Sequence, residues 1–111
     1  MWRSRQRGKL EFAIIGLGRF GSSLGRTLVE RGYTVLGIDQ DRNVVQHLSN
    51  ELTQAVSLDA TDEAALQAID IGAYHTVIVA IADDFENAVL ITATLKNLNV
   101  AKVVTKAATR R

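Results

Sequence analysis

The sequence predicts an α/β domain with a Rossmann-like, doubly wound parallel sheet in the strand order 3-2-1-4-5. Short apolar runs alternate along the chain with helix-like segments, which favours parallel strands joined by helical crossovers. The glycine motif G-x-G-x-x-G, at Gly16, Gly18 and Gly21, follows the first apolar run and opens the first helix-like segment. Asp39 then ends the second apolar run, near the spacing at which dinucleotide-binding folds carry an acidic residue.

Five strands and four helices are predicted in strict alternation. The strands are short, mostly apolar runs, and they span residues 12–15, 34–38, 54–58, 76–80 and 102–106. The helices lie between them, at residues 20–31, 41–49, 63–69 and 84–98. The fourth strand is almost wholly apolar, as expected of a central strand that is buried on both faces.

The ends of the predicted helices carry recognisable signals. Gly32 suits the left-handed residue at which helices commonly end. Asp41 can cap the second helix, either Thr61 or Asp62 the third, and Asp84 the fourth, because these short polar side chains accept hydrogen bonds from first-turn N–H groups.

The composition is that of an ordinary folded domain. The 111 residues fit one small domain, with 47% hydrophobic and 23% charged residues. Cysteine is absent, which excludes disulfides, thiolate nucleophiles and cysteine-ligated zinc. A net charge of +1 argues against a nucleic-acid partner, and we find neither a membrane-spanning apolar run nor a signal peptide. A cytoplasmic protein is therefore expected.

Two parts of the chain are expected. Residues 1–10 form a basic tail that carries four positive side chains, Arg3, Arg5, Arg7 and Lys9. We interpret the tail as solvated, and a tether to acidic lipid or RNA is the alternative. Residues 11–111 form the predicted Rossmann domain. Because a full dinucleotide fold adds a sixth strand that is not apparent here, the sequence is expected to be a fragment of a longer protein.

The glycine motif and Asp39 predict a nucleotide site. Gly16 permits a tight turn, Gly18 lets the backbone approach a pyrophosphate, and Gly21 lets helix and sheet pack closely. The helix N-terminus that follows offers N–H groups and the positive end of a dipole to phosphates. Asp39 is expected to accept hydrogen bonds from both ribose hydroxyls. Its charge disfavours NADP against NAD(H), ADP or ATP, although Arg42 is near enough in sequence to temper this exclusion.

The ends of the third and fourth strands supply further candidates, since such ends line the ligand crevice of open α/β sheets. Asp59 is a candidate acceptor for the adenine amino group, and Ala60 leaves room for the ring. The alternative is that residues 59–62 only cap the third helix. Ala80 and Ile81 are suited to the other face of the adenine or ribose.

Four motifs carry a family resemblance, namely IGLGRFGSSLG, GIDQD, DATD and VIVAIADDFENAVLITATLKNL. Through them the sequence, over residues 12–106, resembles the RCK/KTN domains, which are nucleotide-binding regulators of bacterial Trk and Ktr potassium uptake systems. The resemblance implies a regulatory domain that binds NAD(H), ADP or ATP and gates a potassium channel or transporter by ligand-dependent rearrangement. It also implies a membrane potassium-translocating partner and, in the full-length protein, a dimer or a ring of dimers.

The resemblance also implies a role for Arg19. In the Ktr-like branch the arginine at this place reaches phosphates, including those of a neighbouring subunit, whereas the alternative is a solvated first-turn side chain. Lys106, at the end of the fifth strand, is a second candidate phosphate contact or a surface lysine. The complete set of candidate cofactor-binding residues is Gly16, Leu17, Gly18, Arg19, Phe20, Gly21, Asp39, Gln40, Arg42, Asp59, Ala60, Ala80, Ile81 and Lys106.

No catalytic residue and no metal site are predicted. His47 lies on the polar side of the second predicted helix, and His75 precedes the fourth strand at the end away from the crevice. The acidic residues after the fourth strand are interpreted as helix-capping. The alternative function is the cofactor-binding half of an NAD-dependent dehydrogenase, which would need an acid–base group beside the nicotinamide.

Overall fold

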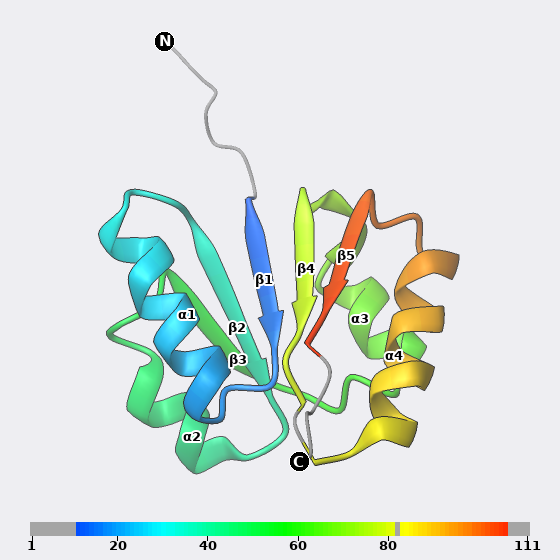
Figure 1. Cartoon of the computed structure of the whole chain (residues 1–111), viewed down its shortest axis with the longest axis horizontal. Helices are drawn as coiled ribbons and strands as arrows, with labels where there is room; N and C mark the ends of the chain where they lie inside the picture. Colours follow the sequence, from blue (N-terminus) through cyan, green and yellow to red (C-terminus); the bar gives the residue numbers. More distant parts are fainter. Residues whose placement is uncertain (1–10, 82, 107–111) are drawn as a thin grey trace, which may run out of the picture.

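The fold is a five-stranded parallel sheet flanked by helices (Figure 1). The computed structural model describes residues 11–81 and 83–106. Its strands are β1 (Phe12–Ile15), β2 (Val35–Asp39), β3 (Gln54–Ser57), β4 (Thr76–Val79) and β5 (Lys102–Thr105). They lie in the order β3-β2-β1-β4-β5, so the predicted strand order is confirmed.

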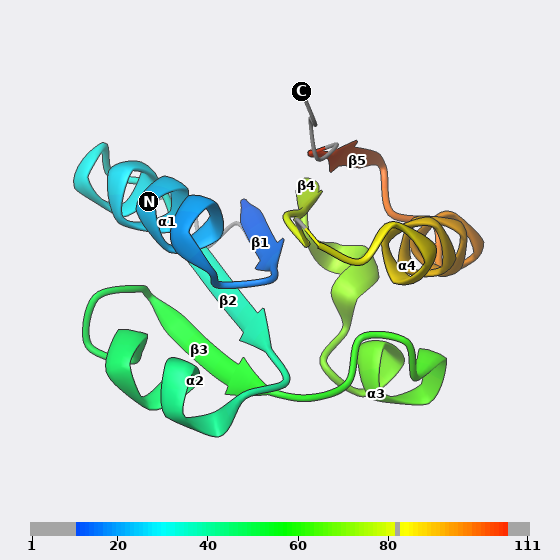
Figure 2. The same cartoon turned by 60° about the horizontal axis from the view of Figure 1, so that its bottom comes forward.

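The helices cover both faces of the sheet. They are α1 (Arg19–Glu30), α2 (Arg42–Leu48), α3 (Glu63–Ala68) and α4 (Phe85–Asn97), with a 3-10 turn η1 (Ile71–Ala73) before β4. Figure 2 shows α1 and α2 on one side of the sheet and α3 and α4 on the other. This arrangement is the doubly wound Rossmann-like fold that the sequence predicts. Each predicted strand and helix lies within one or two residues of its expected bounds, whereas η1 was not expected.

Alternate strand residues supply two separate hydrophobic cores, because successive side chains of a strand point to opposite faces. Ala13 and Ile15 of β1 belong to one core, together with Leu66 of α3 and Leu95 of α4. Ile14 lies on the opposite face, in a core that α1 and α2 complete. The central strand is thus buried on both sides, which is why its sequence is a continuous apolar run.

Aspartates cap three of the four helices in the described part of the chain. Asp41 caps α2, Asp62 caps α3 and Asp84 caps α4, each by accepting a hydrogen bond from a backbone N–H of the first turn. Of the two candidates for α3, Asp62 and not Thr61 therefore supplies the cap. Gly32, which follows α1, has a φ of +94° and provides the expected left-handed residue.

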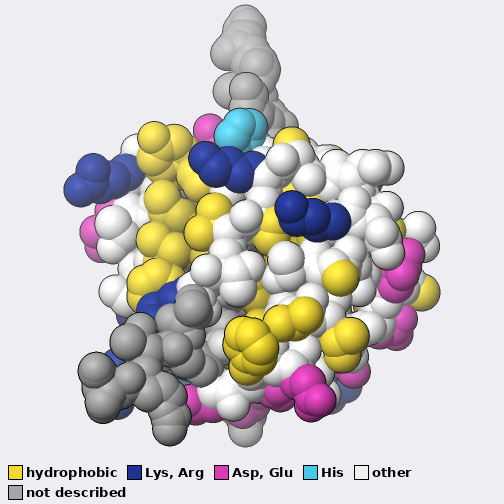
Figure 3. Space-filling view, turned by 45° about the vertical axis from the view of Figure 1, so that its right-hand side comes forward, with side chains coloured by type: hydrophobic (Ala, Val, Ile, Leu, Met, Phe, Trp, Pro, Cys, Tyr) yellow, Lys and Arg dark blue, Asp and Glu magenta, His cyan; other side chains and the backbone are white. Residues whose placement is uncertain are grey.

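The side of the molecule formed by α4 and β5 exposes apolar side chains (Figure 3). Phe85, Val89 and Leu90 of α4 and Val104 of β5 are between 42% and 78% exposed. Figure 3 shows apolar side chains in groups on this face, with basic and acidic side chains around them. Within residues 11–81 and 83–106, no helix combines the length and apolarity needed to cross a membrane.

Candidate functional site

A cleft of about 710 Å³ opens at the carboxyl ends of the strands. Its lining residues include those that follow β1 and β4. Figure 1 shows that the chain leaves β1 toward α1 on one face of the sheet and leaves β4 toward α4 on the other. Such a divergence point is where open α/β sheets bind their ligands. Residues at or just after the carboxyl ends of all five strands line this cleft.

The turn between β1 and α1 is built around two glycines that no other residue could replace without strain. Gly16 has a φ of +100°, and a Cβ there would lie 2.7 Å from the carbonyl oxygen of Ala80. A Cβ on Gly21 would overlap the carbonyl oxygen of Gly16, so this glycine lets α1 approach the turn. A Cβ on Gly18 meets nothing within 4 Å, which leaves the backbone at this position open to the cleft.

Helix α1 begins differently from the other three described helices. Gly18 occupies its N-cap position and offers no side-chain cap, and its first turn contains no acidic residue. The N–H groups of the first turn therefore lack the aspartate that serves α2, α3 and α4. An uncapped helix N-terminus at a cleft favours an anion, because unpaired N–H groups and the positive end of the helix dipole point to it.

Asp39 ties the glycine turn to the end of β2. Its Oδ2 accepts a hydrogen bond from the backbone N–H of Leu17 at 2.8 Å, and its Oδ1 accepts one from Asp41 N–H at 2.9 Å. The carboxylate also lines the cleft. Because a carboxylate has about four lone-pair sites, each Asp39 oxygen retains capacity for a ligand hydroxyl. Its orientation is fixed before any ligand arrives.

Asp59 forms a second fixed carboxylate, at the end of the connection from β3. Its Oδ1 accepts hydrogen bonds from the Thr61 hydroxyl at 2.7 Å and from the Thr61 N–H at 2.9 Å. These two bonds hold the pKa of Asp59 below its ordinary value, with the hydroxyl contributing most. Since Asp62 caps α3, Asp59 orders its own turn instead, and Ala60 beside it is only 8% exposed.

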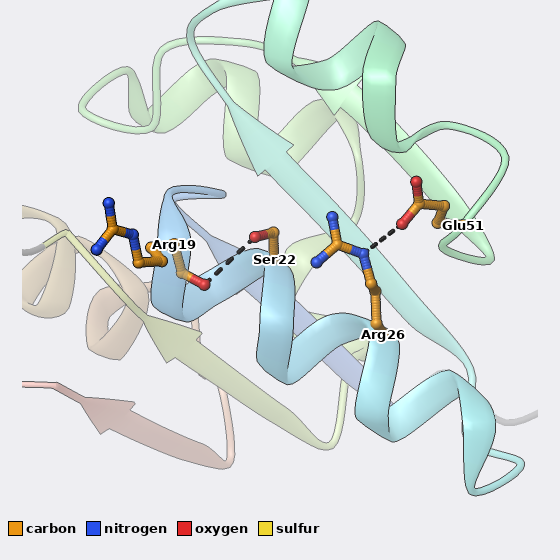
Figure 4. A network of polar contacts seen from close by, with 4 residues as sticks. All are labelled: Arg19, Ser22, Arg26 and Glu51. Atoms are coloured by element: carbon orange, nitrogen blue, oxygen red, sulfur yellow. Dashed lines mark hydrogen bonds and ion pairs between the residues drawn. The ribbon is translucent and has the colours of Figure 1, made fainter.

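Two cations lie at the other end of the cleft, where α1 begins and β5 ends. Arg19 extends from the first turn of α1, away from Arg26, which forms an ion pair with Glu51 (Figure 4). Lys106 follows β5, and its backbone N–H donates to Val79 O at 2.9 Å. Both Arg19 and Lys106 line the cleft.

Most of the sequence-predicted site residues meet at this cleft. Those lining it are Gly16, Gly18, Arg19, Phe20, Asp39, Gln40, Asp59, Ala60, Ala80, Ile81 and Lys106. Three do not line it. Leu17 is buried in the core beneath α1 and α2, Gly21 packs against Gly16, and Arg42 lies exposed at the start of α2.

Other lining residues were not among the predicted set. They include Leu58, Thr61, Asp83, Asp84 and Asn87. All five follow β3 or β4, so their positions after strand ends were the available signal. The interpretation of Asp84 as a helix cap is correct, and the same side chain also lies in the cleft wall.

The fold and this cleft define the chain as a Rossmann-like domain of the nucleotide-binding kind. Comparison with known families gives the narrower assignment, since residues 12–111 match the TrkA-N domain. The chain therefore belongs to the TrkA-N domain family.

Two curated relatives are similar over most of this chain. Ktr system potassium uptake protein C of Bacillus subtilis (strain 168) is 39% identical over 99 residues, or 89% of this chain and 45% of that protein. Ktr system potassium uptake protein A of the same organism is 37% identical over 97 residues, or 87% of this chain and 44% of that protein. The chain thus spans less than half the length of these relatives.

Solved structures share the fold. The NAD(P)-binding domain of an exopolyphosphatase-related protein from Archaeoglobus fulgidus is 27% identical, with a TM-score of 0.78, covering 87% of this chain and 72% of that one. The GsuK channel bound to NAD is 17% identical, with a TM-score of 0.77, covering 89% of this chain and 18% of that one. GsuK has also been solved bound to ADP, with a TM-score of 0.75, 17% identity, and coverage of 89% and 26%.

Proposed function

We propose that this chain is a nucleotide-binding regulatory domain of a potassium uptake system. The observation that carries the proposal is the charge arrangement of the cleft. An uncapped helix N-terminus and two cations stand at one end, and the fixed carboxylates of Asp39 and Asp59 stand at the other. A nucleotide is a ligand with matching ends, because its phosphates are anionic and its ribose and base carry hydrogen-bond donors. Membership of the TrkA-N family and the Ktr relatives support the connection to potassium uptake.

In this proposal the ribose hydroxyls donate to Asp39, whose orientation suits them, and Gln40 lies beside them. The adenine lies between the Asp59–Ala60 turn and the end of β4, where Ala80 and Ile81 present apolar surface. The phosphates lie at the N-terminus of α1. The structures of GsuK with NAD and with ADP support this choice of ligands, and NAD(H), ADP and ATP share the adenosine that the cleft would recognise.

The charge of Asp39 disfavours a ligand with a 2′-phosphate. The carboxylate cannot turn away from such a phosphate without losing its bonds to the backbone N–H groups of Leu17 and Asp41. Loss of hydrogen bonds to a charged group costs about 1.5–3 kcal/mol each. NADP is therefore expected to bind more weakly than NAD.

Regulation would follow from differential binding. The full-length protein would assemble as a dimer or a ring of dimers on the cytoplasmic side of a membrane, against a potassium-translocating subunit. Different nucleotides would favour different arrangements of the packed domains, and each ligand can shift that equilibrium only by its difference in affinity between the states. The chain is proposed to bind its nucleotide without turning it over. Incubation of bound NADH with 2-oxo acids and aldehydes should leave its absorbance unchanged.

The experiment that tests the proposal is calorimetric titration of this chain with ADP, ATP, NAD and NADP. Binding of the first three with one ligand per chain, and a several-fold or larger preference for NAD over NADP, is the expected result. Mass spectrometry under native conditions would then identify whichever nucleotide co-purifies. Absence of binding by all four ligands in a folded sample would overturn the proposal.

A further inference from the structure

Phe20 and Lys106 form a contact that joins the two sides of the cleft's cationic end. The Nζ of Lys106 lies 5.1 Å from the centre of the Phe20 ring, within the range of a cation–π interaction. Phe20 stands in the first turn of α1 and Lys106 follows β5, so the contact links segments far apart in the sequence. Both side chains line the cleft, and Phe20 is 43% exposed.

The ring holds the lysine without cancelling its charge. Within residues 11–81 and 83–106 the ion pair formed is that between Arg26 and Glu51, and Lys106 has no carboxylate partner there. Two acidic residues of the β4–α4 connection, Asp83 and Asp84, also line the cleft, and within the described residues neither forms an ion pair with Lys106. Asp84 accepts hydrogen bonds from the N–H and the side-chain amide of Asn87. A carboxylate on Lys106 would neutralise it, whereas an aromatic ring leaves its full charge and its remaining N–H donors available.

We propose that Phe20 is a positioning residue, whose ring holds Lys106 in place to bind ligand phosphates. A lysine side chain loses substantial rotamer freedom when it is ordered, and a contact made before ligand binding lowers that cost at the moment of binding. The contribution of Phe20 then depends on the phosphates of the ligand and not on its nucleoside. This inference rests on the proposed nucleotide site, and it assigns to Phe20 the function of positioning Lys106.

The test is a set of titrations with ATP, ADP, adenosine and inorganic tripolyphosphate. Phe20→Leu keeps apolar bulk but removes the ring, and Phe20→Tyr keeps the ring. Phe20→Leu should weaken ATP and tripolyphosphate about three- to tenfold, ADP less and adenosine least, while Phe20→Tyr stays within about twofold of the wild type. Phe85→Leu is the matched control, because Phe85 is an exposed phenylalanine outside the cleft, and it should change none of the affinities.

A second variant shows whether Phe20 acts through the lysine. In a Lys106→Met background, Phe20→Leu should have little further effect on ATP, since the cation that the ring positions is gone. The NMR signals of the Lys106 ε-methylene protons should also be shifted upfield by the ring in the ligand-free chain and return to ordinary values in Phe20→Leu. Absence of that shift overturns the contact, whatever the nucleotide affinities are.

The remaining outcomes separate this inference from the proposed function. Equal losses of affinity for adenosine and ATP in Phe20→Leu would mean that the ring contacts the nucleoside. Unchanged affinity for every ligand would mean that the ring does not position Lys106. Either result overturns the inference. Binding of tripolyphosphate that depends on Phe20, without binding of any nucleotide, would overturn the proposed function and leave the inference standing. Failure of the wild type to bind any of the four probes would overturn both.

Discussion

The two ends of the cleft are built in contrasting ways. At the end formed by β2 and β3, short hydrogen bonds hold both carboxylates. The backbone N–H groups of Leu17 and Asp41 donate to Asp39, and the hydroxyl and backbone N–H of Thr61 donate to Asp59. At the end formed by α1 and β5, no hydrogen bond or ion pair within the described residues holds the two cationic side chains, and the Lys106 ammonium lies over the Phe20 ring. One end is held by hydrogen bonds to short aspartate side chains, and the other consists of long cationic side chains without such bonds.

Under the proposed function, this contrast would let one cleft accept related ligands and still distinguish them. A carboxylate with two N–H bonds has little freedom left to lose, so it can select a feature that all the proposed ligands share, which is the adenosine. Arginine and lysine side chains are long and have many rotamers, so the binding free energy that they contribute depends on which phosphate groups a ligand brings within their reach. They suit the end where the proposed ligands differ, which is the phosphates.

The glycine turn connects the two ends, and its replacement should have the largest effect. Gly21→Ala would place a Cβ on top of the carbonyl oxygen of Gly16. Because that oxygen belongs to the backbone, no change of side-chain rotamer can relieve the clash. We expect it to cost about 3 kcal/mol of folding free energy or more, the upper range for overpacked sites. Chemical denaturation measures the loss. Gly18→Ala is the control on the same turn, because its Cβ meets open space, and equal losses for both variants would contradict the packing account.

At the carboxylate end, Asp39→Ala should weaken ADP, ATP and NAD alike, by about 2–3 kcal/mol, because hydrogen bonds to a charged acceptor are lost. The loss should be similar for all three since each presents the same ribose. Asp41→Ala removes a neighbouring aspartate that caps α2 without lining the cleft, so it should lower stability by about 1 kcal/mol and leave affinity unchanged. Calorimetry combined with thermal denaturation tests both. Unchanged affinity in a folded Asp39→Ala variant would remove this residue from the site.

At the cationic end, Arg19→Ala should discriminate among ligands, which Asp39→Ala should not. We expect a loss of about 1.5–2 kcal/mol for ATP, less for ADP and least for NAD, since one charge-assisted contact to a terminal phosphate is removed.

Arg26→Ala is the matched control for Arg19, because both arginines stand on α1 but Arg26 turns to Glu51 (Figure 4). Arg26→Ala should leave the affinities for ATP, ADP and NAD unchanged.

If Arg19 reaches a neighbouring subunit's nucleotide, Arg19→Ala should also abolish any ATP-dependent change in assembly size of the full-length protein, measured by light scattering. Equal losses for the three ligands would make Arg19 a general phosphate contact.

The fold was predictable because its signals are local. The apolar runs, the helix caps and the glycine spacing each report on a few neighbouring residues, and the rules of parallel connection then leave one strand order. The approach of Asp39 to the glycine turn was predictable for the same reason, since β1 and β2 are neighbours in that order.

Side-chain direction within a motif was not predictable. Leu17 lies inside the glycine motif yet faces the core, because the turn points successive side chains to different sides. The close packing at Gly21, by contrast, was expected from the motif. Nor could the sequence show that Lys106 lies over Phe20, a contact that needs the end of β5 to lie beside the start of α1. The choice of Asp62 over Thr61 as the α3 cap depends on the exact residue at which the helix begins, and spacing alone does not fix that boundary to one residue.

The smallest expected effect concerns the fixed carboxylate of Asp59. Its pKa is lowered from 3.8, so its bonds to Thr61 stabilise the folded state above that pH and are lost as the pH falls through the lowered value. Thr61→Ala removes the hydroxyl, whose hydrogen bond is the larger of the two causes of the lowered pKa, whereas Thr61→Ser keeps a hydroxyl at this position. Because Asp59 is exposed, solvent screens the interaction, and we expect Thr61→Ala to cost only about 0.5 kcal/mol of folding free energy near pH 6.

This difference in folding free energy between Thr61→Ala and the wild type should shrink below pH 3.8. The carboxyl carbon of Asp59, followed by NMR, should titrate at a higher pH in the variant. A difference that persists unchanged at low pH would mean that Thr61 stabilises the turn by its own backbone preference, and the carboxylate end of the cleft would then be less firmly fixed by its hydrogen bonds than the geometry indicates.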